Sequence, residues 1–135
     1  MIGGEIMAGK ILIIEDDVST SQFLSYTMER EGYQAITALN GIDGLKKALA
    51  EKPDLIILDI MLPGLDGFEL CHRLRAYPAT ADMPVLILSA KAQDADKSAA
   101  FKMGANCYIV KPADPAKIVD VVKNMLKEPA PGALK

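Results

Sequence analysis

Short apolar stretches alternate with segments of helical periodicity five times along this chain. The apolar stretches have the length and residue types of strands, and the segments between them carry apolar residues three or four positions apart, as amphipathic helices do. The expected strands are residues 10–14, 34–38, 54–59, 85–88 and 107–110, and the expected helices are residues 19–31, 42–51, 67–76, 92–103 and 115–126. Because strands that alternate with helices are typical of sheets covered on both faces, we expect an α/β fold with one doubly wound, five-stranded parallel sheet.

The helix expected at 92–103 differs from the others because small side chains make up most of its apolar face. The residues that we expect to face inward are Ala92, Ala95, Ala99 and Met103, with Phe101 nearby. Alanine side chains bury little apolar area, and burial stabilises by roughly 25 cal/mol per Å². We therefore expect this helix to be weakly anchored and mobile.

Polar residues stand at the carboxyl ends of four expected strands. Glu15-Asp16-Asp17, Asp59, Ser89 and Lys111 follow or end the first, third, fourth and fifth strands, respectively. In open α/β sheets, the carboxyl ends of the strands meet at one edge, and ligands bind there. An edge that carries several acids, one hydroxyl and one lysine has the chemistry of a metal-assisted site for a phosphoryl group.

The three consecutive acids indicate a cation. Neighbouring carboxylates raise one another's pKa unless a positive charge lies among them. Their hard oxygen atoms suit Mg²⁺, which uses one or two carboxylates together with waters and phosphate oxygens, and we expect Mn²⁺ to substitute for it. Asp17 has a simpler explanation as the N-cap of the helix at 19–31, and we expect Asp66 to cap the helix at 67–76.

Asp59 has the position and chemistry of a nucleophile. A carboxylate can attack a phosphoryl group and form an aspartyl phosphate, a reaction that depends mainly on positioning and charge neutralisation. Lys111 would neutralise the transferred oxygens, and Ser89 would donate a hydrogen bond to them. The alternatives are a structural Asp59–Lys111 salt bridge, a strand-end turn at Ser89 and an ordinary surface charge at Lys111. These alternatives explain each residue singly, but not their joint placement.

Composition and length narrow the possible classes of protein. The 135 residues predict one domain at 9–127, after a flexible extension at 1–8 and before a tail or linker at 128–135. The net charge of −3 offers no basic footprint, so we expect no direct nucleic-acid partner. No apolar run approaches the roughly 18 residues of a membrane span, and the first residues do not resemble a signal peptide. We therefore expect no membrane insertion and a cytoplasmic location.

The two cysteines and the single histidine form no recognisable motif. Cys71 and Cys107 fall within apolar patterns, so we expect reduced thiols in the core. A disulfide or a metal pair is the alternative, although neither cysteine has a CxxC partner or a histidine at ligand spacing. We expect His72 to be an exposed helix residue rather than a catalytic base.

Four motifs occur in order along the chain. They are ILIIEDD at 11–17, LDIMLPGLDG at 58–67, SAK at 89–91 and YIVKP at 108–112. With these motifs and their spacing, the chain resembles the receiver domain of two-component response regulators over residues 9 to 127. The resemblance implies a flavodoxin-like (βα)5 sheet with strand order 2-1-3-4-5.

The resemblance also implies a role for each residue of the site. Asp59 is the implied phospho-acceptor, and Glu15 acts on the metal mostly through water. The implied residues are Glu15, Asp16, Asp59 and the backbone carbonyl of Met61 at the metal, Lys111 and Ser89 at the phosphoryl group, and Ser89 and Tyr108 in the switch. For Tyr108, which in the family swings inward when the hydroxyl moves, the alternative is a half-buried tyrosine at the sheet edge.

As a function, the resemblance implies two-component phosphorelay signalling. A sensor histidine kinase or a histidine phosphotransfer protein donates the phosphoryl group, and the surface of the fourth helix, fifth strand and fifth helix then controls a downstream protein. The domain is not an enzyme in the usual sense, because it catalyses only its own phosphorylation and dephosphorylation. We also expect the bulky side chain of Met61 to hinder the hydrolytic water.

Three other classes of protein are alternatives to a receiver domain that accepts a phosphoryl group. A flavin or dinucleotide protein needs a glycine-rich or Ser/Thr-rich phosphate loop after the first strand, where this chain has three acids. A haloacid-dehalogenase-like phosphatase needs a second acid two residues after its nucleophile, where this chain has Met61. The remaining alternative is a receiver-like interaction module that works without phosphorylation, and dependence on Mg²⁺ separates the two. Whether the chain stands alone or belongs to a longer regulator stays open.

Overall fold

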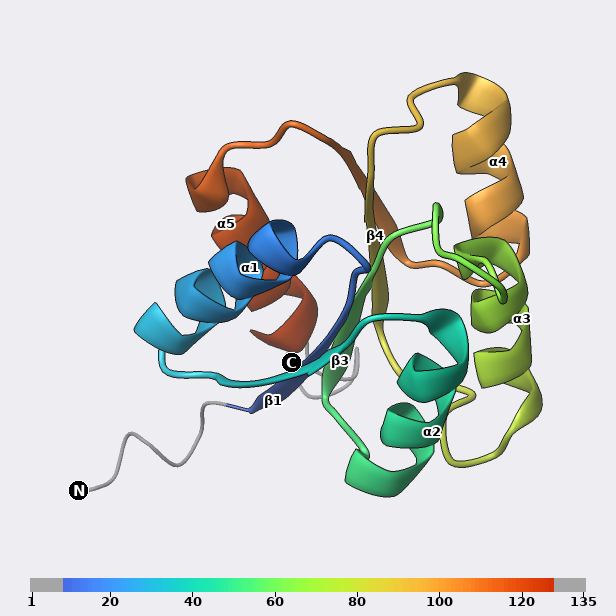
Figure 1. The fold of residues 1–135 in the computed structure, drawn as a ribbon, viewed down its shortest axis with the longest axis horizontal. Helices are drawn as coiled ribbons and strands as arrows, with labels where there is room; N and C mark the ends of the chain where they lie inside the picture. Colours follow the sequence, from blue (N-terminus) through green and yellow to red (C-terminus); the bar gives the residue numbers. More distant parts are fainter. Residues whose placement is uncertain (1–8, 128–135) are drawn as a thin grey trace, which may run out of the picture.

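The computed structural model describes residues 9–127, and in it five parallel strands form one sheet between two layers of helices (Figure 1). The strands are β1 (Lys10–Ile14), β2 (Gln34–Ala38), β3 (Leu55–Leu58), β4 (Val85–Ser89) and β5 (Cys107–Val110). The helices are α1 (Val18–Arg30), α2 (Gly41–Glu51), α3 (Gly67–Ala76), α4 (Asp94–Lys102) and α5 (Pro115–Lys127). The strand order β2-β1-β3-β4-β5 confirms the expected α/β fold with a flavodoxin-like sheet.

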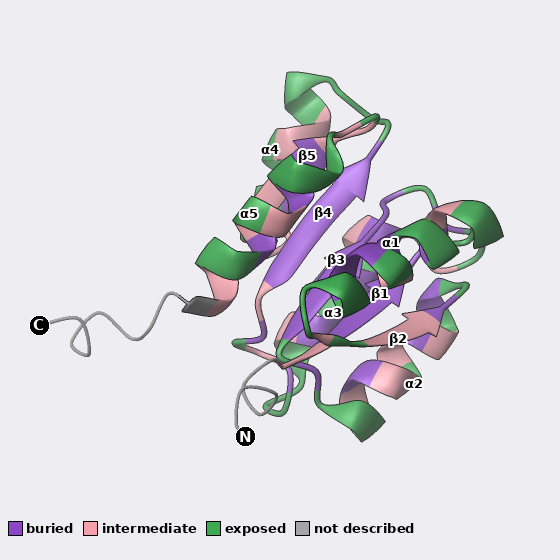
Figure 2. Ribbon diagram, turned by 90° about the vertical axis from the view of Figure 1, so that its left-hand side faces the viewer, coloured by how far each residue is buried: buried purple, intermediate pink, exposed green. Residues whose placement is uncertain are grey.

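Each strand contributes to two separate cores, because successive side chains of a strand point to opposite faces of the sheet. Ile11 and Ile13 of β1 lie in the core beneath α1 and α5, whereas Leu12 and Ile14 lie in the core beneath α2, α3 and α4. The central strands β1, β3 and β4 are buried along nearly their whole length (Figure 2), as is typical of parallel sheets. Their carboxyl ends therefore emerge from a rigid base.

Helix α4 is anchored by a single buried residue, Ala100. The prediction of which residues face inward was wrong in part, because Ala92 precedes the helix and Ala95 is exposed. The helix begins later than expected: the Gln93 N–H donates to Asp96 Oδ2 at 3.2 Å, which ends the preceding loop. The other residues of the expected face are half-buried (Ala99 and Met103) or exposed (Phe101). An alanine-rich helix has little contrast between its faces, so its orientation is hard to predict, and its mobility stays a prediction.

The expectations about cysteine and histidine agree with the structure. Cys71 is buried on α3, Cys107 is half-buried at the start of β5, and both are free thiols, which argues against the disulfide. His72 is exposed on α3. No helix in the described part of the chain is long and apolar enough to cross a bilayer. The extension expected at 1–8 and the tail expected at 128–135 lie outside the described residues.

Candidate functional site

The strand register brings the expected site residues to one edge of the sheet. The end of β1 pairs with the end of β3, so Glu15 and Asp59 lie side by side just beyond the paired residues. The Asp59 N–H donates to the Ile14 carbonyl at 3.1 Å, which extends the pairing to the site itself. Likewise, the Lys111 N–H donates to the Ser89 carbonyl at 2.9 Å, which places Lys111 beside the end of β4.

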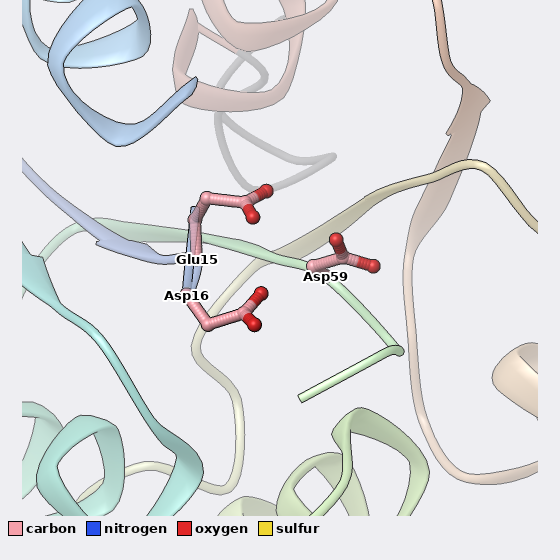
Figure 3. A group of neighbouring side chains, drawn as sticks. All are labelled: Glu15, Asp16 and Asp59. Atoms are coloured by element: carbon pink, nitrogen blue, oxygen red, sulfur yellow. The ribbon is translucent and has the colours of Figure 1, made fainter. Parts of the chain in front are cut away.

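Three carboxylates gather at this edge. Glu15, Asp16 and Asp59 each offer an oxygen atom, and these atoms lie within 4.8 Å of one another. The side chains of Glu15 and Asp16 leave the end of β1 toward the side on which Asp59 lies (Figure 3). Glu15 and Asp59 are only 3% and 7% exposed, whereas Asp16 is exposed. Two of these hard oxygen ligands are therefore buried, and the third faces solvent. Such a cluster fits Mg²⁺, which retains several waters when it binds to a protein.

Lys111 lies between two of these carboxylates. Its Nζ donates to Glu15 Oε1 at 2.7 Å and to Asp59 Oδ2 at 2.9 Å. Buried carboxylates are stable only when they are paired and hydrogen-bonded, and this lysine supplies a partner for both. The Asp59–Lys111 salt bridge, which the sequence left as an alternative, is therefore present, but it belongs to a larger network.

Burial and ion pairing shift the pKa values of two of these groups. The pKa of Glu15 is raised because burial of its carboxylate outweighs the bonds that it accepts from Lys111 and from the Asp17 N–H. Burial alone would lower the pKa of Lys111, but the ion pairs with Glu15 and Asp59 together raise it. One lysine charge does not balance three carboxylates, which is an electrostatic reason for a further cation at this cluster.

Two short backbone segments hold the carboxylates in place. The Asp17 N–H donates to Glu15 Oε2 at 3.0 Å, and the Met61 N–H donates to Asp59 Oδ1 at 3.0 Å. Asp17 itself caps α1 by accepting from the Thr20 N–H at 2.9 Å, which confirms the simpler explanation for this acid. Met61 is 54% exposed, and the role of its carbonyl as a metal ligand stays a prediction.

The expected switch residues are linked through Lys91. Ser89 is fully buried, and its Oγ accepts from the Lys91 N–H at 3.4 Å. Tyr108 is half-buried, and its hydroxyl donates to the Lys91 carbonyl at 2.8 Å. Lys91 could not be predicted as a link from the sequence, because it makes both contacts through backbone atoms, which every residue type has.

Two further local features belong to the site. Asp66 caps α3 by accepting from the Glu69 N–H at 2.9 Å, as expected. The Lys111–Pro112 peptide bond, at the end of β5, is cis. The structure thus brings Glu15, Asp16, Asp59 and Lys111 into one cluster. Ser89 and Tyr108 are joined to each other through Lys91 and take no part in the ion pairs of that cluster.

Sequence comparisons agree with this geometry. The sequence model of the family described as the response regulator receiver domain matches residues 11–123. The chain is 45% identical over 121 residues to the alkaline phosphatase synthesis transcriptional regulatory protein PhoP of Bacillus subtilis (strain 168), covering 90% of this chain and 50% of the relative. It is 38% identical over 128 residues to the phosphate regulon transcriptional regulatory protein PhoB of Rhizobium meliloti (strain 1021), covering 95% of this chain and 56% of the relative. The chain thus spans about half the length of these curated relatives.

Solved structures show the same fold. The chain is similar to the chemotaxis protein CheY4 of Vibrio cholerae, with a TM-score of 0.83 and 30% identity over 87% of this chain and 98% of that chain. It is also similar to the BeF3-activated N-terminal receiver domain of Klebsiella pneumoniae RstA, with a TM-score of 0.82 and 30% identity over 87% of this chain and 98% of that chain. Fold, motifs and site geometry therefore point to one family.

Proposed function

Because this chain belongs to the receiver domains of two-component response regulators, we propose that it serves in a phosphorelay by accepting a phosphoryl group on Asp59. One observation carries the proposal: the buried Asp59 carboxylate lies 2.9 Å from Lys111 Nζ and within the acidic cluster at the strand edge. The proposed donor is a phosphohistidine on a sensor histidine kinase or a histidine phosphotransfer protein. The domain catalyses only its own phosphorylation and dephosphorylation.

Receiver domains typically bind Mg²⁺ at such an acidic cluster, and the donor set of this chain fits that ion. Glu15, Asp16, Asp59 and the backbone carbonyl of Met61 would hold it, with Glu15 acting mainly through water. When bound, Mg²⁺, or Mn²⁺ in its place, neutralises phosphoryl oxygens as a Lewis acid.

Phosphoryl transfer itself requires little covalent work from the protein. One carboxylate oxygen of Asp59 forms a bond to phosphorus, and the bond between phosphorus and the donor's imidazole nitrogen breaks, leaving its electron pair on nitrogen. Lys111 already lies beside the carboxylate and neutralises the charge that gathers on the transferred oxygens. The hydroxyl group of Ser89 donates a hydrogen bond to one of these oxygens.

The proposed output is a shift between two arrangements of the α4–β5–α5 surface. A phosphoryl group that draws Ser89 toward Asp59 changes the contact between Ser89 and Lys91, and Lys91 in turn holds the Tyr108 hydroxyl. Helix α4, with its single buried residue, offers little resistance to rearrangement. A downstream protein that binds one arrangement better than the other then reads the signal.

The proposal concerns the receiver segment and not a longer protein. The names of the relatives describe transcriptional regulators, of which this chain spans about half. The expected absence of direct nucleic-acid contact therefore applies to this segment alone, and a cytoplasmic location is part of the proposal.

Incubation with acetyl phosphate, with and without Mg²⁺ and followed by intact mass, tests the function. We expect the wild type and Asp66→Asn, which changes an exposed aspartate of the same loop, to gain one phosphoryl group only when Mg²⁺ is present. Asp59→Asn should gain none. If the wild type gains nothing with Mg²⁺, the chain is instead a phosphorylation-independent, receiver-like interaction module.

Met61 is proposed to slow hydrolysis of the aspartyl phosphate, because this bulky residue is exposed and its N–H donates to the phospho-acceptor carboxylate of Asp59 at 3.0 Å. Met61→Asn should shorten the lifetime of the phosphorylated protein severalfold, measured by intact mass after removal of acetyl phosphate. Met61→Leu, which keeps an apolar side chain of similar size, serves as the control. Equal lifetimes for all three proteins would rule out this role.

A further inference from the structure

The loop that joins β3 to α3 carries Met61 and is closed at its base by two hydrogen bonds. The Ile60 carbonyl accepts from the Leu62 N–H at 3.0 Å and from the Gly67 N–H at 2.9 Å. The side chains of Ile60 and Leu62 are buried in the core beneath α2, α3 and α4, on either side of the exposed Met61. The position of the Met61 backbone therefore depends on how the loop at 60–67 is held as a unit.

A second element supports the far side of this loop. Gly41, the first residue of α2, packs so tightly against Leu65 that an ideal Cβ at position 41 would lie 2.2 Å from the Leu65 carbonyl oxygen and 3.1 Å from its carbonyl carbon. Real Cβ atoms essentially never come within 3.0 Å of such atoms. Any side chain at position 41 therefore has to displace the backbone of the loop or the start of α2.

The start of α2 is the less movable of the two partners. Asn40 caps the helix by accepting from the Asp43 N–H at 2.8 Å, and its carbonyl accepts from the Gly44 N–H at 2.9 Å. Gly41 and Gly44 are both buried against their neighbours. The loop has no regular secondary structure, so the displacement falls mainly on the loop that contains Met61.

We propose that Gly41 is a positioning residue for the metal site, acting through Leu65 on the loop that presents the Met61 carbonyl. This inference rests on the proposed function, because it takes Met61 to be a metal ligand. Mg²⁺ demands nearly ideal octahedral geometry, so a loop shifted by a fraction of an ångström binds it less well. Groups that orient metal ligands without touching the metal typically change metal affinity by about 10- to 100-fold.

Gly44 provides a matched control in the same helix. An ideal Cβ at position 44 would also be too close to its neighbour, at 2.6 Å from Cδ1 and 3.0 Å from Cγ1 and Cγ2 of Ile14, but all of these atoms belong to a side chain. A side chain can rotate away, whereas a backbone carbonyl cannot. Gly44→Ala should therefore cost stability through core packing and leave the loop where it is.

The test compares the wild type, Gly41→Ala and Gly44→Ala in two measurements. The dissociation constant for Mg²⁺ alone is measured by amide chemical-shift titration, and the free energy of unfolding is measured by urea without metal. We expect both variants to be less stable, but only Gly41→Ala to bind Mg²⁺ about tenfold more weakly. If Gly41→Ala is too unstable to titrate, adding trimethylamine N-oxide to all three samples favours the folded state and permits the same comparison.

The outcomes separate this inference from the proposed function. If the wild type fails to bind Mg²⁺, the proposed function itself is wrong. If the wild type binds Mg²⁺ and Gly41→Ala binds it within twofold of the wild type, only the role of Gly41 is overturned. Equal weakening in Gly41→Ala and Gly44→Ala would likewise overturn it, because the effect would then follow stability.

Discussion

Two cationic side chains hold polar atoms together at opposite edges of the sheet, and their partners differ in kind. At the carboxyl edge, Lys111 donates to the carboxylates of Glu15 and Asp59. At the other edge, Arg75 on α3 donates six hydrogen bonds. The acceptors of Arg75 are the carbonyls of Thr80, Ala81, Met83 and Gly104 and Oδ1 of Asn106.

The difference indicates which of the two polar clusters can take up a further ion or a phosphoryl group. The carbonyls around Arg75 are uncharged and fixed by the chain, so its bonds join the α3–β4 and α4–β5 connections permanently. The carboxylates of the Lys111 cluster outnumber the lysine and include the exposed Asp16, so a metal ion or a phosphoryl group can join them. A cation among backbone carbonyls is therefore structural, whereas a cation among buried acids at the carboxyl edge indicates chemistry.

Removing Arg75 should have the largest effect on stability. Arg75→Met leaves several carbonyls without their charged donor, and we expect the free energy of unfolding to fall by about 3 kcal/mol. Arg73→Met is the control, because Arg73 forms only an exposed pair with Glu69 and should cost about 0.3 kcal/mol. Urea unfolding measures both, and equal losses would show that the Arg75 bonds carry no special weight.

Removing Lys111 should cost less and should be reversible by metal. Lys111→Met leaves the Glu15 and Asp59 carboxylates without their cation, so we expect a loss of about 2 kcal/mol in EDTA. Because Mg²⁺ supplies the missing positive charge, saturating Mg²⁺ should restore more of the stability of this variant than it adds to the wild type. Arg75→Met should gain no such extra stability, and the contrast between the edges fails if Mg²⁺ rescues both variants alike.

Alkaline pH should weaken the fold by a smaller amount. The pKa of Lys111 is raised by its two ion pairs against the opposing effect of burial, and burial raises the pKa of the Cys71 thiol. A pKa raised by folding adds stability that is complete below the unfolded value and is lost as the pH rises through the folded value. The free energy of unfolding should therefore decline above about pH 9, the ordinary pKa of a thiol, and decline further beyond the ordinary pKa of lysine, near 10.5.

Two variants separate the contributions to this alkaline decline. Cys71→Ala should reduce the earlier part of the decline, to which Cys107 also contributes because burial raises its pKa. Lys111→Met should reduce the later part, to which Lys123 also contributes because its hydrogen bond to Glu31 raises its pKa. Urea unfolding at a series of pH values gives both curves. Stability that rises between pH 9 and 11 in the wild type would contradict the directions of these shifts.

The smallest expected effect lies in α4, which runs between the two edges. Its C-terminal side is tied to Arg75 through the Gly104 carbonyl, whereas the loop before its N-terminal side contains Lys91, which contacts Ser89 and Tyr108. On phosphorylation, amide hydrogen exchange should change severalfold at residues 90–97 and little at 104–106. An unchanged pattern throughout α4 would contradict both the proposed switch and the predicted mobility of this helix.

The features that the sequence predicted well are those with local signals. Apolar runs set the strands, and Asp17 and Asp66 occupy the cap positions that carboxylates prefer. Polar residues at strand ends indicated which acids and which lysine would lie together at one edge of the sheet. Features that depend on distant backbone atoms were not predictable. The residue type of Arg75 does not predict that the Gly104 carbonyl is its hydrogen-bond partner. Likewise, the contact between Gly41 and Leu65 exists only after α2 and the β3–α3 loop have packed together.

The central claim is that Asp59, and no other acid of the cluster, carries the phosphoryl group. Sodium borohydride reduces an aspartyl phosphate to homoserine, so treating the phosphorylated protein and sequencing its peptides by mass spectrometry locates the modified residue. We predict homoserine at position 59 alone, and only in samples that contained Mg²⁺. Reduction at Asp16, at Asp66 or at no aspartate would contradict the account.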